Sequence, residues 1–189
     1  MFLRKKIVEE TMKEIEKEMQ ELNRYWACFT GHRPQKLPWG YNENDERCID
    51  MINRTKAEIE NAIKKGYHTF LCGMALGFDM ICAEIVLELK KKYPYVILEG
   101  AIPCLNQDAK WNSQSKERYR KILGQCDVKT VLSEVYTPTC MNDRNMYMVE
   151  QSDVVIAIWN GKPSGTGNTV QFAKEKGCKI KIINPEKYR

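Results

Sequence analysis

Short apolar runs alternate with longer amphipathic stretches along most of this chain. Runs rich in β-branched residues and bounded by turn residues predict strands buried on both faces. Stretches whose apolar residues recur every three or four positions predict helices. The expected strands are 25–30, 69–72, 95–102, 128–132, 154–159 and 178–183. The expected helices are 45–65, 78–91, 113–124, 141–151 and 170–176.

Strands separated by helices of this length pair in parallel through right-handed crossovers. The sequence therefore predicts an α/β fold over residues 25–189: a single three-layer, doubly wound, Rossmann-like domain with a mainly parallel sheet. Such sheets bind ligands beyond the carboxyl ends of their strands, where the strand order reverses. We therefore expect the functional residues in the loops that follow the strands.

Residues 1–24 are expected to form an N-terminal helical extension. Between Arg4 and Asn23 the apolar residues are alternately four and three apart, on one narrow seam: Val8, Met12, Ile15, Met19 and Leu22. This seam fits packing on the domain's own surface and, equally, pairing with the same helix of a second subunit. The second alternative predicts a homo-oligomer, with a dimer as its simplest form.

Composition limits the possible partners. Hydrophobic residues make up 43% of the 189 residues and charged residues 29%, as in globular proteins. No apolar run reaches membrane-spanning length and no signal-peptide core follows Met1, so we expect a cytoplasmic protein with no membrane partner. A net charge of +5 suits an anionic ligand but falls short of the concentrated patch of a duplex DNA binder.

The eight cysteines are scattered, with no Cys-x-x-Cys pair and no histidine at zinc-like spacing. Four of them lie in apolar segments, where reduced cysteine behaves as a small buried hydrophobe: Cys28, Cys72, Cys82 and Cys178. We expect no metal, no disulfide and no required cofactor.

A run of small residues follows the strand at 154–159 and leads into a helix. Such a junction presents unpaired N–H groups and the positive end of the helix dipole, which suits a phosphate. An ordinary N-cap by Thr166 or Asn168 would need only one such residue. We therefore expect a phosphate cradle made by Gly161, Ser164, Gly165, Thr166, Gly167, Asn168 and Thr169.

Two earlier strand ends carry further candidates. After 69–72, Gly73, Met74, Ala75 and Gly77 leave the backbone bare, and Asp79 is placed to cap a helix or accept from a sugar hydroxyl. The alternative for these glycines is tight packing of helix on strand. The first strand ends in residues suited to anion contact, Thr30, Gly31, His32 and Arg33. Trp39, farther along, fits either stacking on a base or covering the core.

Arg144 opens the helix expected at 141–151, between Asp143 and Asn145. Neighbours of opposite charge most often form a solvated ion pair. If residues 133–140 carry the chain back across the strand ends, Arg144 and Asn145 instead face the ligand.

Four of these segments together resemble the SLOG superfamily of Rossmann-like nucleotide-binding proteins, in its YpsA-like branch, to which no function is assigned. The resemblance covers about residues 26–185 and rests on 30–34, 73–79, 144–148 with Ser152 and Asp153, and 164–169. The loop 73–79 is also similar to that of the DprA family of single-strand DNA-binding proteins.

Residues 141–145 through Asp153, with Gly165 and Thr166, also resemble the Lonely Guy phosphoribohydrolases. That resemblance implies a catalytic arginine at Arg144 and a glutamate shortly after the Gly-Thr pair. Here no carboxylate follows until Glu175. Because glycosidic cleavage needs a carboxylate, this departure weighs against hydrolysis.

The sequence thus predicts a protein that senses or sequesters a nucleotide or nucleotide-derived signal, such as an ADP-ribose-like or cyclic-nucleotide molecule. One alternative is an N-glycoside hydrolase of nucleoside 5'-monophosphates that uses Asp143, Asp79 or Asp108. Another is a single-stranded nucleic-acid-binding module, which the mild charge excess disfavours.

Overall fold

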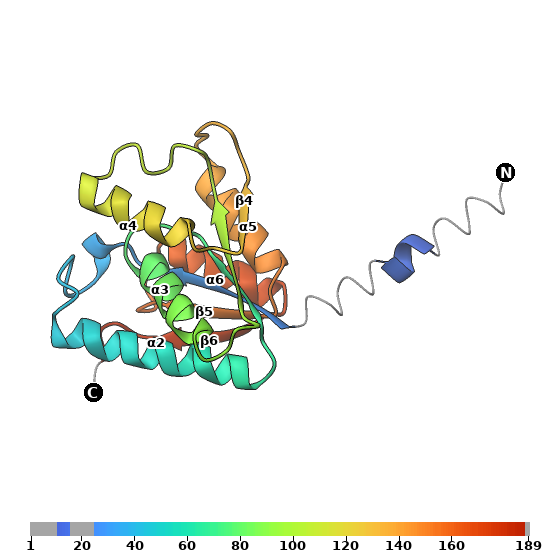
Figure 1. Ribbon diagram of the computed structural model, residues 1–189, viewed down its shortest axis with the longest axis horizontal. Coiled ribbons are helices and arrows are strands. Elements are labelled where there is room, and N and C mark those ends of the chain that lie inside the picture. The colour runs from blue at the N-terminus through green and yellow to red at the C-terminus, as the bar shows by residue number, and fades with distance from the viewer. Residues whose placement is uncertain (1–10, 16–24, 188–189) are drawn as a thin grey trace.

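The computed structural model describes residues 11–15 and 25–187. Six strands form one sheet in the order β4-β3-β2-β1-β5-β6, and every neighbouring pair is parallel (Figure 1). The strands are β1 (Trp26–Gly31), β2 (Thr69–Cys72), β3 (Ile97–Ile102), β4 (Val128–Val131), β5 (Val154–Ile158) and β6 (Lys179–Ile183). The connecting helices are α2 (Glu46–Lys64), α3 (Phe78–Lys90), α4 (Ser113–Leu123), α5 (Cys140–Glu150) and α6 (Gly165–Glu175). The predicted fold class is confirmed.

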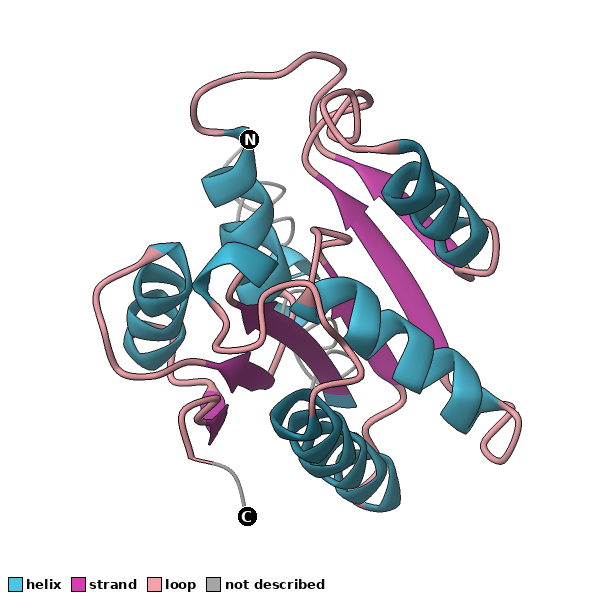
Figure 2. Ribbon diagram, turned by 90° about the vertical axis from the view of Figure 1, so that its left-hand side faces the viewer, coloured by secondary structure: helices cyan, strands magenta, loops and turns pink. Residues whose placement is uncertain are grey.

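The helices cover both faces of the sheet, so that the strands run between two groups of helices (Figure 2). Successive side chains of a strand point to opposite faces. In β1, Ala27 and Phe29 join the larger core, which includes α2 and α3 residues, whereas Cys28 joins the smaller core with α5 and α6 residues. This double burial explains why the inner strands β1, β2 and β5 are almost wholly apolar, whereas the edge strands β4 and β6 carry exposed lysines.

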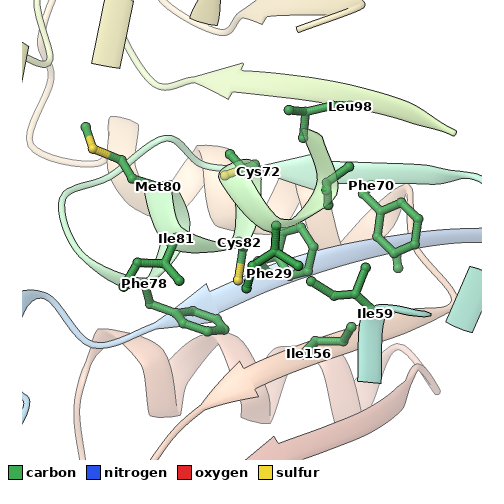
Figure 3. Packing of buried hydrophobic residues seen from close by; sticks show 14 of the residues in the cluster. Phe29, Ile59, Phe70, Cys72, Phe78, Met80, Ile81, Cys82, Leu98 and Ile156 are labelled. Atoms are coloured by element: carbon green, nitrogen blue, oxygen red, sulfur yellow. The ribbon is translucent and has the colours of Figure 1, made fainter. Parts of the chain in front are cut away.

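Three phenylalanines anchor the larger core (Figure 3). The ring of Phe29 stacks on Phe70 at 6.0 Å and meets Phe78 edge-on at 6.5 Å. All three side chains are fully buried. Because β1, β2 and the start of α3 each contribute one ring, this cluster fixes where α3 begins relative to the strand ends.

The strand order reverses beside β1. From β1 the chain builds β2, β3 and β4 outward on one side, and then returns to place β5 against the other side of β1. Gly31 pairs with Ile158, so the carboxyl ends of β1 and β5 lie level. The two loops that leave these ends diverge, which opens a crevice between them.

The expected start of the last helix is wrong. Helix α6 begins at Gly165, not at residue 170, because Ser164 caps it: its Oγ accepts from the Gly167 N–H at 3.1 Å. Asn168 N–H then donates to the Ser164 carbonyl at 2.9 Å. Capping thus outweighs the low helix propensity of two glycines. The other boundaries agree with the expected ones to within two residues.

Of the expected N-terminal helix, only Thr11–Ile15 lies within the described residues, and this piece is helical. Its two seam residues, Met12 and Ile15, are exposed. The remainder of the seam falls outside the described part, so its partner remains a prediction. Among the described residues, no helix has the length and apolarity that a membrane crossing requires.

Gly31 is the tightest point between β1 and α3. A Cβ on Gly31 would lie 2.3 Å from Cδ1 of Phe78, a contact that only a shift of α3 would relieve. We predict that Gly31→Ala lowers the free energy of unfolding by about 1–3 kcal/mol, measured by urea denaturation. Gly165→Ala is the control, because a Cβ there meets open space. Equal stability of Gly31→Ala and the wild type would contradict the packing described.

Candidate functional site

A pocket of about 300 Å³ lies at the carboxyl ends of the strands, beside the reversal of strand order. We call it the strand-end pocket. Four separate segments of the chain meet there: the end of β1, the loop before α3, the start of α5 and the start of α6. Its lining is Phe29, Thr30, Gly31, His32, Arg33, Gln35, Lys36, Ala75, Asp79, Met141, Arg144, Asn145, Ser164, Gly165 and Thr166.

Most of the residues predicted for a site come together in this lining. The predicted residues found there are Thr30, Gly31, His32, Arg33, Ala75, Asp79, Arg144, Asn145, Ser164, Gly165 and Thr166. The predicted residues outside it are Gly73, Met74, Gly77, Gly161, Gly167, Asn168 and Thr169. Of the second group, Gly161 and Asn168 are exposed, and the other five residues have structural contacts described below.

The amino end of α6 faces the pocket through its first two residues, Gly165 and Thr166. N–H groups in the first turn of a helix have no acceptor within the helix, and the helix dipole makes this end positive. Ser164 satisfies the Gly167 N–H, so the two residues that line the pocket offer the remaining donors. This arrangement is the one that binds anions at helix ends.

The later residues of this segment hold the helix in place. A Cβ on Gly167 would lie 3.3 Å from the Trp159 ring, so glycine allows α6 to approach that side chain closely. Thr169 Oγ1 donates to the Gly165 carbonyl at 3.0 Å and accepts from Asn145 Nδ2 at 3.1 Å. This pair ties α5 to α6. Asn168 is exposed on the helix surface.

His32 connects the ends of β1 and β5 with α6. Its Nδ1 lies 3.4 Å from Thr166 Oγ1 and its Nε2 lies 3.4 Å from Asn160 Oδ1. Burial lowers the pKa of His32 below its usual 6.5, and the contact with Asn160 opposes that shift. Burial therefore favours the neutral imidazole, which lines the pocket and lies between the side chains of Thr166 and Asn160.

Arg144 does not pair with its neighbour Asp143. Its Nη1 lies 3.5 Å from Oδ2 of Asp79, and the two side chains are only 5% and 8% exposed. Asp143 instead accepts from Thr139 Oγ1 at 2.8 Å. Burial raises the pKa of Asp79, and the charge of Arg144 opposes this shift. The solvated pair between Arg144 and Asp143, one alternative from the sequence, is therefore wrong.

Gly73 makes room for this ion pair. A Cβ at Gly73 would lie 1.5 Å from Arg144 Nη1, so the guanidinium lies directly on the glycine backbone. The next residue, Met74, is buried in a left-handed conformation at φ 56°, which is uncommon outside glycine. Gly77 also has positive φ, and Pro34 packs against it. The loop thus places Asp79 next to Arg144, and its residues Ala75 and Asp79 line the pocket.

The mouth of the pocket is positively charged. Arg33 and Lys36 are exposed there, and Arg144 lies deeper, whereas Asp79 is the lone carboxylate among the lining residues described.

Two residues that line the pocket, Gln35 and Lys36, were not predicted from the sequence. The feature of the sequence that could have indicated them is Pro34, which starts the 3-10 turn η2 (Pro34–Lys36) and so brings the two residues to the pocket. Trp39 is buried in the core, so of its two alternatives the structure shows the second, covering the core.

The other two carboxylates considered for hydrolysis do not reach the pocket. Asp143 is exposed, and Asp108 lies 3.9 Å from Arg120 in an ion pair. Asp79 does line the pocket, but Arg144 and the Ala75 N–H engage its Oδ2. Across residues 11–15 and 25–187, no three His, Cys, Asp or Glu side chains gather as a metal site requires.

The buried ion pair predicts a stability effect. We expect Arg144→Ala to lower the free energy of unfolding by about 3 kcal/mol, because it leaves Asp79 buried without its counter-charge. Adding Asp79→Asn should recover part of the loss, measured by urea denaturation as a double-mutant cycle. Arg120→Ala, whose side chain is 72% exposed, should change stability by less than about 0.5 kcal/mol. A stability of Arg144→Ala equal to that of the wild type would mean that the pair contributes nothing.

The lowered pKa of His32 predicts a pH effect. Below pH 6.5 this histidine binds a proton more readily in the unfolded chain than in the folded protein, because burial lowers the pKa of His32 in the fold. The free energy of unfolding should therefore fall as pH falls, by at most about 1.4 kcal/mol per pH unit. The variant His32→Asn should lack this contribution between pH 7.5 and 5.5. Parallel stability curves for the two proteins, from denaturation at each pH, would contradict the assignment.

Sequence comparison places the chain among bacterial relatives. The YpsA family model, described as the YspA SLOG family, matches residues 27–188. The SPbeta prophage-derived protein YoqJ of Bacillus subtilis (strain 168) is 32% identical over 140 residues, covering 67% of this chain and 82% of that protein. A UPF0398 protein of Bacillus pumilus (strain SAFR-032) is 32% identical over 145 residues, covering 74% and 75%.

Two solved structures share the fold. DNA processing protein A (DprA) from Streptococcus pneumoniae matches with a TM-score of 0.58 at 17% identity, over 85% of this chain and 50% of that one. DprA from Helicobacter pylori matches with a TM-score of 0.57 at 19% identity, over 83% and 64%. The chain therefore spans about half to two thirds of these DprA chains. The family model matches nearly the whole folded domain, and the strand-end pocket lies where the strand order reverses, so we conclude that this protein belongs to the YspA SLOG family.

Proposed function

We propose that this protein binds a nucleotide or nucleotide-derived signal in the strand-end pocket and acts as a sensor or sequestering protein. One observation carries the proposal: the first two amides of α6 face a pocket whose mouth holds the exposed cations Arg33 and Lys36. The carboxylate in its lining, Asp79, is already matched by Arg144. An anion entering this pocket meets helix-end donors and exposed positive charge without facing an unpaired carboxylate.

Each segment then has a role toward the ligand. Ser164, Gly165 and Thr166 hold the phosphate at the helix end, and Arg33 and Lys36 close over it. His32 and Thr30, at the end of β1, lie where a sugar hydroxyl would be bonded. Arg144 acts through position, because its pairing with Asp79 fixes the start of α5 beside the pocket.

The size of the pocket limits what it encloses. A volume of about 300 Å³ is at the lower end of the range for small-molecule sites. It accommodates a mononucleotide or cyclic nucleotide, whereas an ADP-ribose-like ligand would extend past Arg33 and Lys36 into solvent. We therefore expect mononucleotide-sized ligands to be the best enclosed.

Single-stranded nucleic acid is a second candidate, supported by the shared fold of the DprA proteins. The Helicobacter pylori protein is described as having a single-stranded DNA binding mode. Affinity that rises with oligonucleotide length and falls steeply with salt would favour this candidate over a small signal.

Binding is better supported than N-glycoside hydrolysis. Hydrolysis needs a carboxylate free to stabilise a cationic transition state or to activate water, and Arg144 already engages the carboxylate of Asp79. Release of free base from nucleoside 5'-monophosphates, followed by chromatography, tests this directly. Turnover that Asp79→Asn abolishes would establish the hydrolase instead.

The binding proposal is tested by calorimetric titration with AMP, cyclic nucleotides, ADP-ribose and oligonucleotides. For a nucleotide that binds, Arg33→Ala and Lys36→Ala should each weaken binding by about 1–2 kcal/mol, because each removes a charge-assisted contact with phosphate. Both side chains are exposed, so the melting temperature should not change. Lys179→Ala lies at the amino end of β6, whereas the pocket lies at the carboxyl ends of the strands, so this variant should bind like the wild type. Lack of binding across the whole panel, or equal weakening by Lys179→Ala, would overturn the proposal.

A further inference from the structure

A series of polar contacts leads from the segment after β6 into the strand-end pocket. Glu186 Oε1 accepts from Asn160 Nδ2 at 2.9 Å. Asn160 Oδ1 lies 3.4 Å from Nε2 of His32, and Nδ1 of His32 lies 3.4 Å from Thr166 Oγ1. His32 and Thr166 line the pocket, whereas Asn160 and Glu186 lie outside its lining. Residues outside the pocket can therefore act on a hydroxyl group inside it.

Two contacts fix the orientation of the Asn160 amide. Its NH₂ group donates to the Glu186 carboxylate, and its oxygen accepts from the Lys162 backbone N–H at 3.1 Å. The bonds from Asn160 and from the Lys162 side chain hold the pKa of Glu186 below its usual value, so this group is a carboxylate at pH 7 and can only accept. Asn160 therefore presents its oxygen, and not its NH₂ group, to His32.

The orientation of Asn160 decides which nitrogen of His32 carries the hydrogen. Burial lowers the pKa of His32, which favours the neutral imidazole with a single N–H group. That hydrogen lies on Nε2, because Nε2 faces the Asn160 oxygen, which can only accept. Nδ1 then has a lone pair, so the Thr166 hydroxyl donates to it. A hydroxyl has one hydrogen, and toward any other partner the Thr166 oxygen can therefore only accept.

We propose that the Thr166 hydroxyl is an acceptor toward the strand-end pocket and selects a phosphate ester that also carries a hydroxyl group, as a ribonucleotide does. This inference rests on the proposed function and names the group that the ligand must offer beside its phosphate. The amides of Gly165 and Thr166 hold the phosphate, and the Thr166 oxygen accepts from the sugar hydroxyl. Asn160 and Glu186 act through His32 and are positioning residues.

The hydrogen-bond series is tested in the free protein. Long-range ¹H–¹⁵N nuclear magnetic resonance at pH 7.5, above the ordinary pKa of histidine, distinguishes a protonated ring nitrogen from a bare one. The chain has one other histidine, His68, so the signals missing in His32→Asn identify those of His32. We expect the hydrogen on Nε2 alone. Asn160→Leu removes the acceptor, so a population with the hydrogen on Nδ1 should appear. Glu186→Gln is the matched control, because it keeps an acceptor for the Asn160 NH₂ group and should keep the wild-type spectrum.

Selection is tested by calorimetric titration with AMP and with 2',3'-dideoxyadenosine 5'-monophosphate, which has the same phosphate and base but no sugar hydroxyl. The wild type should bind AMP about tenfold more tightly, because the dideoxy ligand leaves the Thr166 oxygen without a donor. Thr166→Val should bind the two ligands equally. Thr166→Ser, which keeps the hydroxyl, should keep the preference. Circular dichroism melting of each variant shows whether it folds.

The two experiments separate failure of this inference from failure of the proposed function. Equal affinity of the wild type for the two ligands would overturn the selection, as would a preference for AMP that Thr166→Val retains, while nucleotide binding itself would stand. Lack of binding across the whole nucleotide panel would overturn the proposed function and the selection with it. A hydrogen on Nδ1 of His32 in the wild type, or a spectrum that Asn160→Leu leaves unchanged, would overturn the hydrogen-bond argument whether or not a nucleotide binds.

Discussion

The site depends on one constraint of chain path, the reversal of strand order at β1. Because β2 and β5 flank the same strand, the chain leaves the ends of β1 and β5 in different directions, and the strand-end pocket lies between them. The level pairing of Gly31 with Ile158 brings the two loops to one height. The amino end of α6 and the η2 turn then meet across this opening. The pocket is thus a consequence of topology, to which the local sequence adds donors and charge.

The buried pair of Arg144 and Asp79 is the second element on which the site depends. It joins the start of α5 to the start of α3, two helices on opposite faces of the sheet. Three local features allow the two groups to meet: the missing side chain at Gly73, the left-handed Met74 and the positive φ of Gly77. Such strain persists where the surrounding structure fixes it, and it is frequent at ligand sites. The sequence of the loop at residues 73–79 suggests a ligand-binding surface. In the structure this loop mainly makes room for the ion pair between Arg144 and Asp79.

This difference shows what the sequence can and cannot predict. Apolar runs of strand length separated by helical periodicity were sufficient for the order of elements, the parallel sheet and the edge on which the pocket lies. They were not sufficient for partners, because a contact between Arg144 and Asp79 spans 65 residues and leaves no local pattern. The start of α6 was missed for a related reason: two glycines suggested a loop, whereas the side chain of Ser164 caps a helix. Lys36 was missed because only the turn after Pro34 brings it over the pocket.

The central claim is that the first amides of α6 hold an anionic group of the ligand. Nuclear magnetic resonance of the ¹⁵N-labelled protein, titrated with AMP, tests it most directly. The account predicts the largest amide shifts at Gly165 and Thr166, with smaller ones at His32 and Arg33 and none along β4. Saturable shifts that spare Gly165 and Thr166 and cluster elsewhere, or no shifts at all, would contradict it.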